Sequence, residues 1–288
     1  MAALVRNLDP TRPLTSGNNQ PYQWNNLYRA GLTDVFGLNY HTQNYDDARV
    51  WFPGVPLFGS ETASSLNSRG WYPQPSTDTL IVPKEWWLTY ETKDHQVPAY
   101  DNCRAPWAEL HEEAWARIKN RDWMAGTFVW TGFDYLGEPT PYNLMPNHSS
   151  NFGIIDLASI PKDRYYLYRS QWRKDVSTLH VLPHWTWPGR EGQVTPVHVY
   201  TSYPSAELFV NGVSQGVRTK DKSDEQGRYR LMWNDVVYQP GEIKVVALDT
   251  LYTGSEDNIA DLRGSFDFRF IQDDVIDATG SWQKIHGI

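Results

Sequence analysis

A parallel α/β architecture is indicated by the stretch Pro56-Leu-Phe-Gly-Ser-Glu-Thr-Ala-Ser-Ser65. It begins with a short apolar run and then places one acidic residue, Glu61, among small and hydroxylated neighbours. An uninterrupted apolar run is typical of a strand in a parallel sheet whose two faces are covered by helices. Barrel enzymes place catalytic residues just past the C-terminal end of such strands. The alternative is that Glu61 is a capping carboxylate at the start of a helix.

A second and stronger apolar run is Gly126-Thr-Phe-Val-Trp-Thr-Gly-Phe-Asp-Tyr-Leu-Gly-Glu138, which also ends in polar and aromatic groups. Between the two runs, residues 107–122 carry a helical stripe of apolar side chains with charges opposite. Upstream, residues 34–40 predict a strand, flanked by predicted helices at residues 20–30 and 44–51. Strands alternating with helices at short spacing indicate a parallel sheet with right-handed crossovers.

The pattern changes after residue 176. Four short β-rich segments follow without an intervening helical pattern, at residues 194–201, 206–210, 228–233 and 242–248. Asn211-Gly212 is a strong signal for a two-residue hairpin turn. We therefore predict a first domain over residues 1–176, a linker at 177–192, and an antiparallel sandwich over 193–288. Residues 273–288 are either a tail or a last strand.

Composition excludes several classes of protein and site. The 26 basic and 34 acidic residues give a net charge of −8 with no basic cluster, which argues against nucleic acid or an anionic membrane as partner. One cysteine, Cys103, excludes an intramolecular disulfide framework and a cysteine-based zinc site. The histidines show no metal-binding spacing. We expect no metal and no cofactor.

Aromatic residues are unusually frequent, with 14 Trp, 17 Tyr and 10 Phe. Many of these rings lie in polar, proline-rich segments such as residues 69–73 and 85–87 rather than in apolar runs. Rings on polar loops suit stacking against the apolar faces of sugars, although some of them must fill cores.

Several long motifs together resemble glycoside hydrolase family 2, and in particular its bacterial β-galactosidases. They are Leu57-Phe-Gly-Ser-Glu-Thr-Ala-Ser64 and Phe128-Val-Trp-Thr-Gly-Phe-Asp-Tyr-Leu-Gly-Glu-Pro-Thr-Pro-Tyr142, with Asp9-Pro-Thr-Arg-Pro13, Gly37-Leu-Asn-Tyr40 and Tyr100-Asp-Asn-Cys-Arg-Ala-Pro-Trp107. The resemblance covers roughly residues 1–250 and keeps the order of the family's motifs. It implies the C-terminal half of a (β/α)₈ TIM barrel, strands five to eight, followed by an immunoglobulin-like β-sandwich.

The resemblance also implies an activity: retaining hydrolysis of terminal, non-reducing β-D-galactosides through a glycosyl-enzyme intermediate. Glu61 matches the family's nucleophile, Tyr40 the tyrosine that hydrogen-bonds it, and Trp130 the tryptophan that forms the floor of the sugar subsite. Asn39, Asp134 and Glu138 are close enough to predicted strand ends to line the same pocket. Each of these three has an equally good interpretation as a loop cap.

One expected catalytic group is not found. In the family the acid/base glutamate follows an asparagine just before the segment that resembles residues 9–13, and the sequence contains no Asn-Glu pair. We therefore expect a truncated or split enzyme that is inactive or weakly active alone. Its expected partners are a β-galactoside and either a separate N-terminal chain or a second copy. The alternative is a non-catalytic carbohydrate-binding or complementing fragment. A periplasmic or extracellular location would suit the full-length enzyme.

Overall fold

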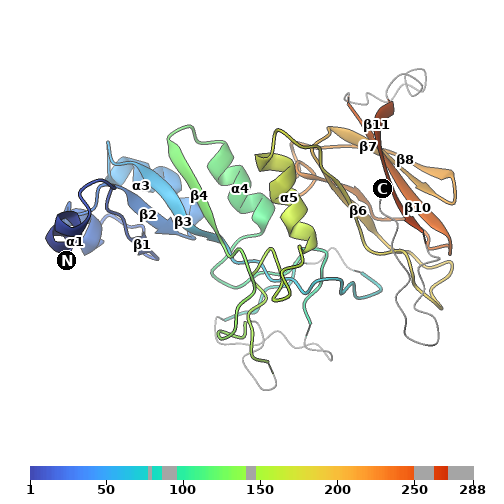
Figure 1. Cartoon of the computed structure of the whole chain (residues 1–288), viewed down its shortest axis with the longest axis horizontal. Helices are drawn as coiled ribbons and strands as arrows, with labels where there is room; N and C mark the ends of the chain where they lie inside the picture. Colours follow the sequence, from blue (N-terminus) through green and yellow to red (C-terminus); the bar gives the residue numbers. More distant parts are fainter. Residues whose placement is uncertain (77–79, 86–95, 141–146, 250–262, 272–288) are drawn as a thin grey trace. The chain divides into compact units, whose positions relative to one another are not determined.

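The computed structural model describes residues 1–76, 80–85, 96–140, 147–249 and 263–271 (Figure 1). By internal contacts the chain divides into two compact units. The first comprises Met1–Trp71 with Asp78–Lys162, and the second comprises Tyr72–Thr77 with Asp163–Ile288. The predicted linker at 177–192 does not coincide with this division, because the helix at Asp163–Trp172 packs within the second unit.

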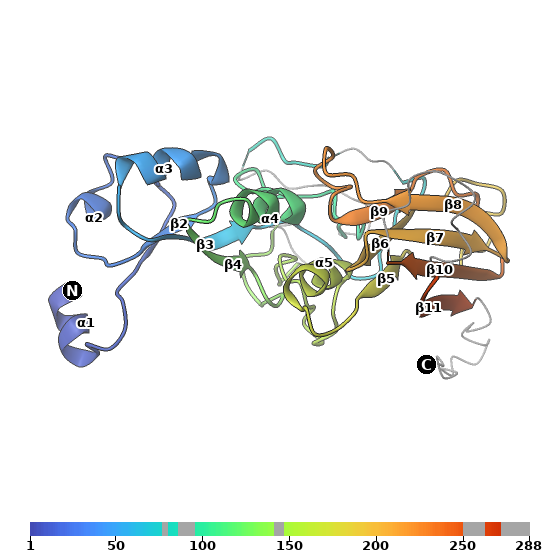
Figure 2. The same cartoon turned by 90° about the horizontal axis from the view of Figure 1, so that it is seen from above.

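The first unit is built on a four-stranded parallel sheet. Its strands lie side by side in chain order, β1 (Gly17–Asn18), β2 (Phe36–Asn39), β3 (Leu57–Ala63) and β4 (Met124–Trp130). Right-handed crossovers between consecutive parallel strands place all the connections on one side of a sheet. The helices α2 (Asn26–Arg29), α3 (Tyr45–Trp51) and α4 (His111–Lys119) lie on that side (Figure 2). A 3₁₀ turn, Thr42–Asn44, leads from β2 to α3, and α1 (Ala2–Leu8) precedes the sheet.

Apolar side chains between the sheet and these helices form the core of the first unit. The strands contribute the fully buried Leu38 and Leu57 together with Met124. The helices contribute Ala48 from α3 and Ile118 from α4. These buried positions fall in the apolar runs of the sequence, and the prediction of a parallel sheet is confirmed. The expectation that helices cover both faces is not met among the described residues, where α2, α3 and α4 all pack on one face.

Two predicted element boundaries are wrong. The helix predicted at residues 20–30 is only α2, because the Asn25 side chain accepts from the Leu27 N–H and caps the helix there. An asparagine that bonds nearby backbone groups competes with helix formation. In addition, Glu61 lies inside β3 and not after its C-terminal end.

The second unit contains two antiparallel sheets. One has the order β11-β10-β7-β8, and the other has the order β5-β6-β9. The bounds are β5 Leu179–Leu182, β6 Val197–Thr201, β7 Ser205–Val210, β8 Val213–Thr219, β9 Arg230–Trp233, β10 Glu242–Leu248 and β11 Arg263–Ile271. Buried side chains from both sheets, including Val199 and Leu208, form one core, as expected for a sandwich. Sequence analysis missed β5, β8 and β11. Residues 273–288, which are predicted to be either a tail or a last strand, lie outside the described residues.

The helix α5 (Asp163–Trp172) explains why the second unit begins before the sandwich. Its first residue, Asp163, accepts from Tyr72 at 2.6 Å and lies 2.7 Å from Nε2 of His180 in β5. Tyr166 of α5 stacks on the His180 ring with centroids 3.8 Å apart. These contacts hold α5 and the segment after Trp71 to the sandwich.

The predicted hairpin at Asn211-Gly212 is confirmed. It joins β7 to β8 by two residues, both with positive φ, at 50° for Asn211 and 78° for Gly212. Replacing Gly212 by Val should lower the free energy of unfolding by about 1–2 kcal/mol, because a β-branched residue is strained in the left-handed region. The measurement is urea unfolding, with Val213→Thr, an exposed neighbour, as the control. Equal stability of the two variants would contradict the strain argument.

Candidate active site

Side chains from β2, β3 and β4 meet at the carboxyl-terminal ends of these parallel strands, which we call the carboxyl edge of the sheet. Cα register pairs Asn39 with Glu61 and Ala63 with Trp130. The Tyr40 N–H donates to the Glu61 carbonyl at 2.7 Å, so Tyr40 directly continues the β2 pairing. Glu61, Tyr40 and Trp130 therefore reach the same edge from three neighbouring strands. This is the edge at which open and closed parallel sheets carry ligand sites.

A hydrogen-bonded chain connects Glu61 to two side chains. The Tyr40 hydroxyl donates to Glu61 Oε2 at 2.8 Å, and the Ser64 hydroxyl donates to the Tyr40 oxygen at 2.9 Å. Burial, reinforced by the Glu61 carboxylate, raises the pKa of Tyr40 well above its usual range, while Ser64 and Trp107 oppose that shift. Tyr40 therefore keeps its proton and acts as a fixed donor to the carboxylate.

The backbone around these hydrogen-bonded side chains is strained. Tyr40 and His41 have φ of 51° and 49°, and Ala63 and Ser64 have φ of 70° and 60°. Non-glycine residues in the left-handed region are uncommon and cluster at functional sites, where the surrounding structure must hold them. Two consecutive left-handed residues thus come directly after β2, and another two end β3. They aim Tyr40 and Ser64 at each other across the strand ends.

Trp130 ends β4 with its indole only partly buried. It packs against the cluster that contains Leu66 and Phe152, and meets Tyr135 edge-on with ring centroids 5.9 Å apart. The peptide bond after it, to Thr131, is cis. A large, half-exposed ring fixed on its edge is suited to stacking against a sugar face.

The predicted site residue Asn39 is buried, at 7% exposure, with both ends of its amide engaged. Its Nδ2 donates to Asn19 Oδ1 at 2.9 Å, and its Oδ1 accepts from the Ser60 hydroxyl at 2.5 Å. Asn39 therefore links β1, β2 and β3 at the edge of the sheet. Both are bonds between side chains, so neither is the side-chain to backbone bond of a loop cap.

Asp134, another predicted site residue, belongs to a buried ion pair. Its carboxylate lies 2.7 Å from Lys162 Nζ, and the side chains are 8% and 1% exposed. Asp134 also accepts from the Gly153 N–H at 2.8 Å. Lys162 donates in addition to the Asn67 carbonyl at 2.7 Å. We conclude that this carboxylate holds together the loops that follow β3 and β4, and does not face Glu61 in a hydrogen bond.

Glu138 is exposed and lies in the loop after β4. Its carboxylate accepts a hydrogen bond from the Tyr135 hydroxyl, and its φ of 42° is left-handed. Tyr135 in turn contacts Trp130, which connects Glu138 indirectly to the end of β4.

Sequence reasoning missed three residues of this site. Ser64 bonds to Tyr40, Trp107 opposes the rise in the pKa of Tyr40, and the buried Glu109 contacts the turn that comes after Tyr40. Trp107 ends a segment whose motif gave it no role. Glu109 falls in the first turn of the helix predicted at residues 107–122, where a carboxylate is ordinary, so no local signal distinguished it. The observed helix α4 begins only at His111.

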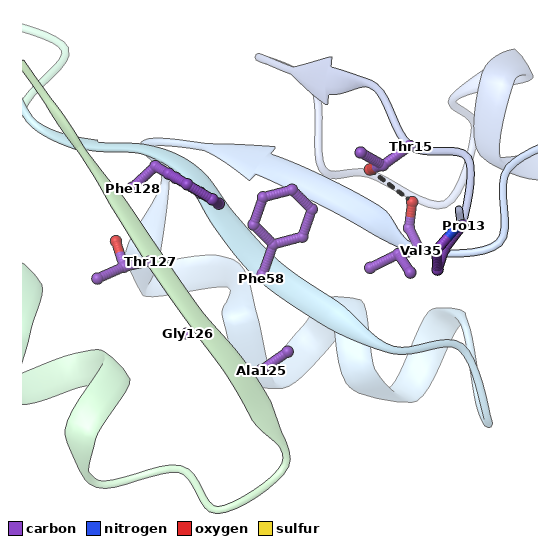
Figure 3. A pocket seen from close by; sticks show the side chains of 8 residues that line it. All are labelled: Pro13, Thr15, Val35, Phe58, Ala125, Gly126, Thr127 and Phe128. Atoms are coloured by element: carbon purple, nitrogen blue, oxygen red, sulfur yellow. Dashed lines mark hydrogen bonds between the residues drawn. The ribbon is translucent and has the colours of Figure 1, made fainter. Parts of the chain in front are cut away.

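A separate hollow of about 430 Å³ opens on the sheet face that is turned away from the helices (Figure 3). Phe58 and Phe128 line it from β3 and β4, with their rings edge-to-face at 5.7 Å, and Phe128 is 67% exposed. The lining residues Val35, Phe58 and Ala125 belong to the amino-terminal parts of the strands. Glu61, Tyr40 and Trp130 are not among its lining residues, so the hollow is not part of the candidate active site.

In the part of the chain that the structure describes, no three His, Cys, Asp or Glu side chains are grouped so that they could hold a metal ion. Within the same residues, no helix has the length and apolarity that a membrane span requires.

The chain is similar to known proteins over most of its length. It is 43% identical over 251 residues to the β-galactosidase BoGH2A of Bacteroides ovatus, covering 87% of this chain and 28% of that protein. It is 30% identical to a putative β-glucuronidase of Formosa agariphila, covering 85% of this chain and 24% of the relative. A β-glycosidase from Bacteroides vulgatus has a similar structure, with a TM-score of 0.69 and 29% identity over 86% of this chain and 32% of the other.

The family model for a domain of unknown function, DUF4982, matches residues 192–250, which lie in the sandwich. The chain spans less than a third of the length of the two curated relatives, at 28% and 24%. Sequence similarity to BoGH2A and structural similarity to family 2 glycosyl hydrolases agree with the motifs around Glu61 and Trp130. This chain is a relative of the glycoside hydrolases of family 2, and it corresponds to part of their length.

Proposed function

We propose that this chain carries the nucleophile half of the active site of a retaining glycoside hydrolase, with Glu61 as the nucleophile. The observation that supports this most directly is the hydrogen bond of 2.8 Å from Tyr40 to Glu61 at the carboxyl edge of a parallel sheet. A protonated phenol fixes one carboxylate oxygen and leaves the other available for attack. The relation to family 2 makes glycoside chemistry the natural use of this geometry.

In the proposed reaction, a Glu61 oxygen forms a bond to the anomeric carbon as the bond to the leaving oxygen breaks. The product is a glycosyl ester, which water then hydrolyses. Tyr40 keeps its proton throughout and orients the carboxylate. Trp130 lies beneath the sugar ring. Its packing against Tyr135 fixes the position of the indole on which the sugar rests. Ser64 holds the Tyr40 oxygen in place from the other side.

The leaving oxygen also needs a proton. Retaining hydrolases supply it from a second carboxyl group about 5–5.5 Å from the nucleophile. We propose that another polypeptide segment provides this group, since the sequence contains no Asn-Glu pair. Asp134 is bonded to Lys162, and Glu138 to Tyr135, which leaves neither in a hydrogen bond with the Glu61 site.

The proposed architecture is the second half of a TIM barrel followed by an immunoglobulin-like sandwich. Four parallel strands in chain order with helices on one face are what such a half barrel contains. The open face with Phe58 and Phe128 is the side that further barrel strands would cover. We propose that a separate N-terminal polypeptide covers it, and a second copy of this chain is the competing occupant.

The proposed substrate is a terminal, non-reducing β-D-galactoside. Support comes from the 43% identity to a protein named as a β-galactosidase, compared with 30% to one named as a putative β-glucuronidase. A non-catalytic role in binding carbohydrate is the second candidate, favoured by the half-exposed Trp130. The two functions differ in whether Glu61 forms a covalent bond.

Activity of the 288-residue chain should depend strongly on the leaving group. A dinitrophenyl β-galactoside should be cleaved slowly, because dinitrophenolate departs without a proton, whereas lactose should not be cleaved detectably. Proton donation typically contributes about 10²- to 10⁴-fold. The measurement is release of dinitrophenol and of glucose by the purified chain, with Glu61→Gln as the control. Efficient, Glu61-dependent cleavage of lactose would show that the chain contains its own proton donor.

A further inference from the structure

Two strained segments have to stay in register for the Glu61 site to exist. One is Tyr40–His41 after β2, and the other is Ala63–Ser64 at the end of β3. Strand pairing ends at Tyr40, whose N–H bonds the Glu61 carbonyl, and at Ala63. The sheet therefore does not fix the conformation of His41 or Ser64, which lie beyond these ends. Left-handed non-glycine residues persist only where neighbouring groups hold them. A residue that contacts both segments would therefore control the site.

The Glu109 side chain contacts Thr42, the residue that directly follows the first segment. Its Oε1 accepts from the Thr42 hydroxyl at 2.8 Å and from the Thr42 N–H at 3.2 Å. Thr42 is fully buried and begins the 3₁₀ turn directly after His41. The carboxylate thus satisfies two donors at the start of that turn, in the manner of a helix cap, and fixes the path of the chain after Tyr40.

Glu109 contacts the second segment through its main chain. Its N–H donates to the Ala63 carbonyl at 3.1 Å, and its carbonyl accepts from the Ser65 hydroxyl at 3.0 Å. Ala63 and Ser65 are fully buried and flank Ser64, which donates to Tyr40. One residue therefore joins the strained end of β3 to the strained turn after β2.

We infer that Glu109 is a positioning residue for Glu61, because it holds the Tyr40 and Ser64 segments in the geometry that orients the nucleophile. This inference rests on the proposed function for its consequence, but the contacts that carry it are independent of Glu61 chemistry. Glu109 does not touch Glu61 and acts through Thr42, Ala63 and Ser65.

The surroundings of Glu109 predict which substitutions preserve its role. It is 8% exposed, and burial raises the pKa of its carboxyl group, while the bonds from Thr42 oppose that shift. Oε2 has no hydrogen-bond partner among the described residues. Arg117 and Glu113 are the charged groups that act on it. Glutamine has the same shape and a carbonyl oxygen for Thr42, so Glu109→Gln should preserve the contacts, whereas Glu109→Ala removes the acceptor.

The test is covalent trapping of Glu61 by 2,4-dinitrophenyl 2-deoxy-2-fluoro-β-D-galactopyranoside. Glu61 displaces dinitrophenolate and forms an ester with the fluorosugar, which mass spectrometry of the Glu61 peptide detects. We expect Glu109→Ala to lower the trapping rate constant on the order of 10²-fold at similar reagent affinity, because a misplacement of about 1 Å can cost that much. Glu109→Gln should remain within a few-fold of the wild type.

Ile118→Val is the matched control for lost stability. Ile118 is buried in α4, in the same unit as Glu109. It belongs to the apolar cluster between the sheet and the helices, which does not include Tyr40, His41, Ala63 or Ser64. It should lower the melting temperature while leaving the trapping rate unchanged. If a folded Glu109→Ala variant is trapped at the wild-type rate, the inference is wrong.

Hydrogen exchange gives a second test that needs no activity. In Glu109→Ala, amide exchange should become faster in both of the peptides around residues 39–45 and 61–67. In Ile118→Val, exchange in these two peptides should not increase more than in the rest of the first unit. Unchanged exchange in both peptides overturns the inference. If the wild-type chain is never trapped at Glu61, the proposed function is refuted but the inference about Glu109 is not. The hydrogen-exchange measurement then decides the role of Glu109.

Discussion

Replacing Glu61 by Gln should abolish hydrolysis in the enzyme that contains this chain, with a loss in turnover of roughly 10⁴-fold or more, as for other covalent nucleophiles. The amide cannot form the glycosyl ester, yet its oxygen can still accept from Tyr40. Because Glu61 lies partly exposed at the edge of the sheet, the melting temperature should change little. The measurement is the initial rate with a dinitrophenyl β-galactoside, together with a thermal melt.

Two further variants make this result specific. Glu61→Gly opens space for a small anion, so azide should restore glycosyl transfer and yield an α-glycosyl azide. Glu138→Gln changes an exposed carboxylate that is bonded to Tyr135, and it should retain turnover within a few-fold. Normal turnover by Glu61→Gln, or equal losses in both glutamate variants, would refute the assignment of the nucleophile.

The largest effect on stability should come from Lys162. Lys162→Met leaves the Asp134 carboxylate buried without its cation, and breaking one side of a buried ion pair costs about 3–5 kcal/mol. The pair is buried on both sides, at 1% and 8% exposure. The free energy of unfolding of the first unit should fall by that amount. The measurement is urea unfolding, monitored by tryptophan fluorescence.

The double variant Lys162→Met/Asp134→Asn should lose less than Lys162→Met alone, because no unpaired charge remains. Arg173→Met is the surface control. Arg173 pairs with Asp175 at 2.6 Å, but the two side chains are 58% and 64% exposed, so its urea midpoint should hardly move. A midpoint for Lys162→Met that equals that of Arg173→Met would contradict the role of the buried pair.

Much of the first unit could be predicted because its strands are apolar runs. Residues 34–40 are predicted correctly because every residue of β2 is buried. Residues 126–131 are predicted correctly because they are apolar, although in β4 only Met124 is buried and Phe128 lines the open hollow. The helix at 20–30 is wrong because one side chain, Asn25, ends the loop with a cap that a hydrophobic pattern does not reveal. Strand β8 was missed because it is largely polar and none of its residues is fully buried, so it carries no alternating pattern.

Some residues of the candidate site could likewise be predicted from the sequence, and others could not. Glu61, Tyr40 and Trp130 could be assigned because long motifs surround them, and the structure brings their three strand ends together. The partners of Asp134 could not be predicted, since Lys162 lies 28 positions away and the pairing depends on the path of two loops. Glu109 meets Thr42 across 67 positions, a separation at which no sequence pattern predicts contact.

The Asp134–Lys162 pair has a consequence for attempts to change the sugar that the enzyme prefers. A designer choosing randomisation positions by proximity to Trp130 would include Asp134, although its carboxylate is committed to Lys162 and to the Gly153 N–H. Gly153 is equally intolerant, because a methyl group there would lie 2.1 Å from the Asp134 nitrogen. Libraries that vary these three positions should return mostly unfolded clones. Diversity placed at exposed Glu138 should be accepted far more often and should sample the same side of the sugar platform.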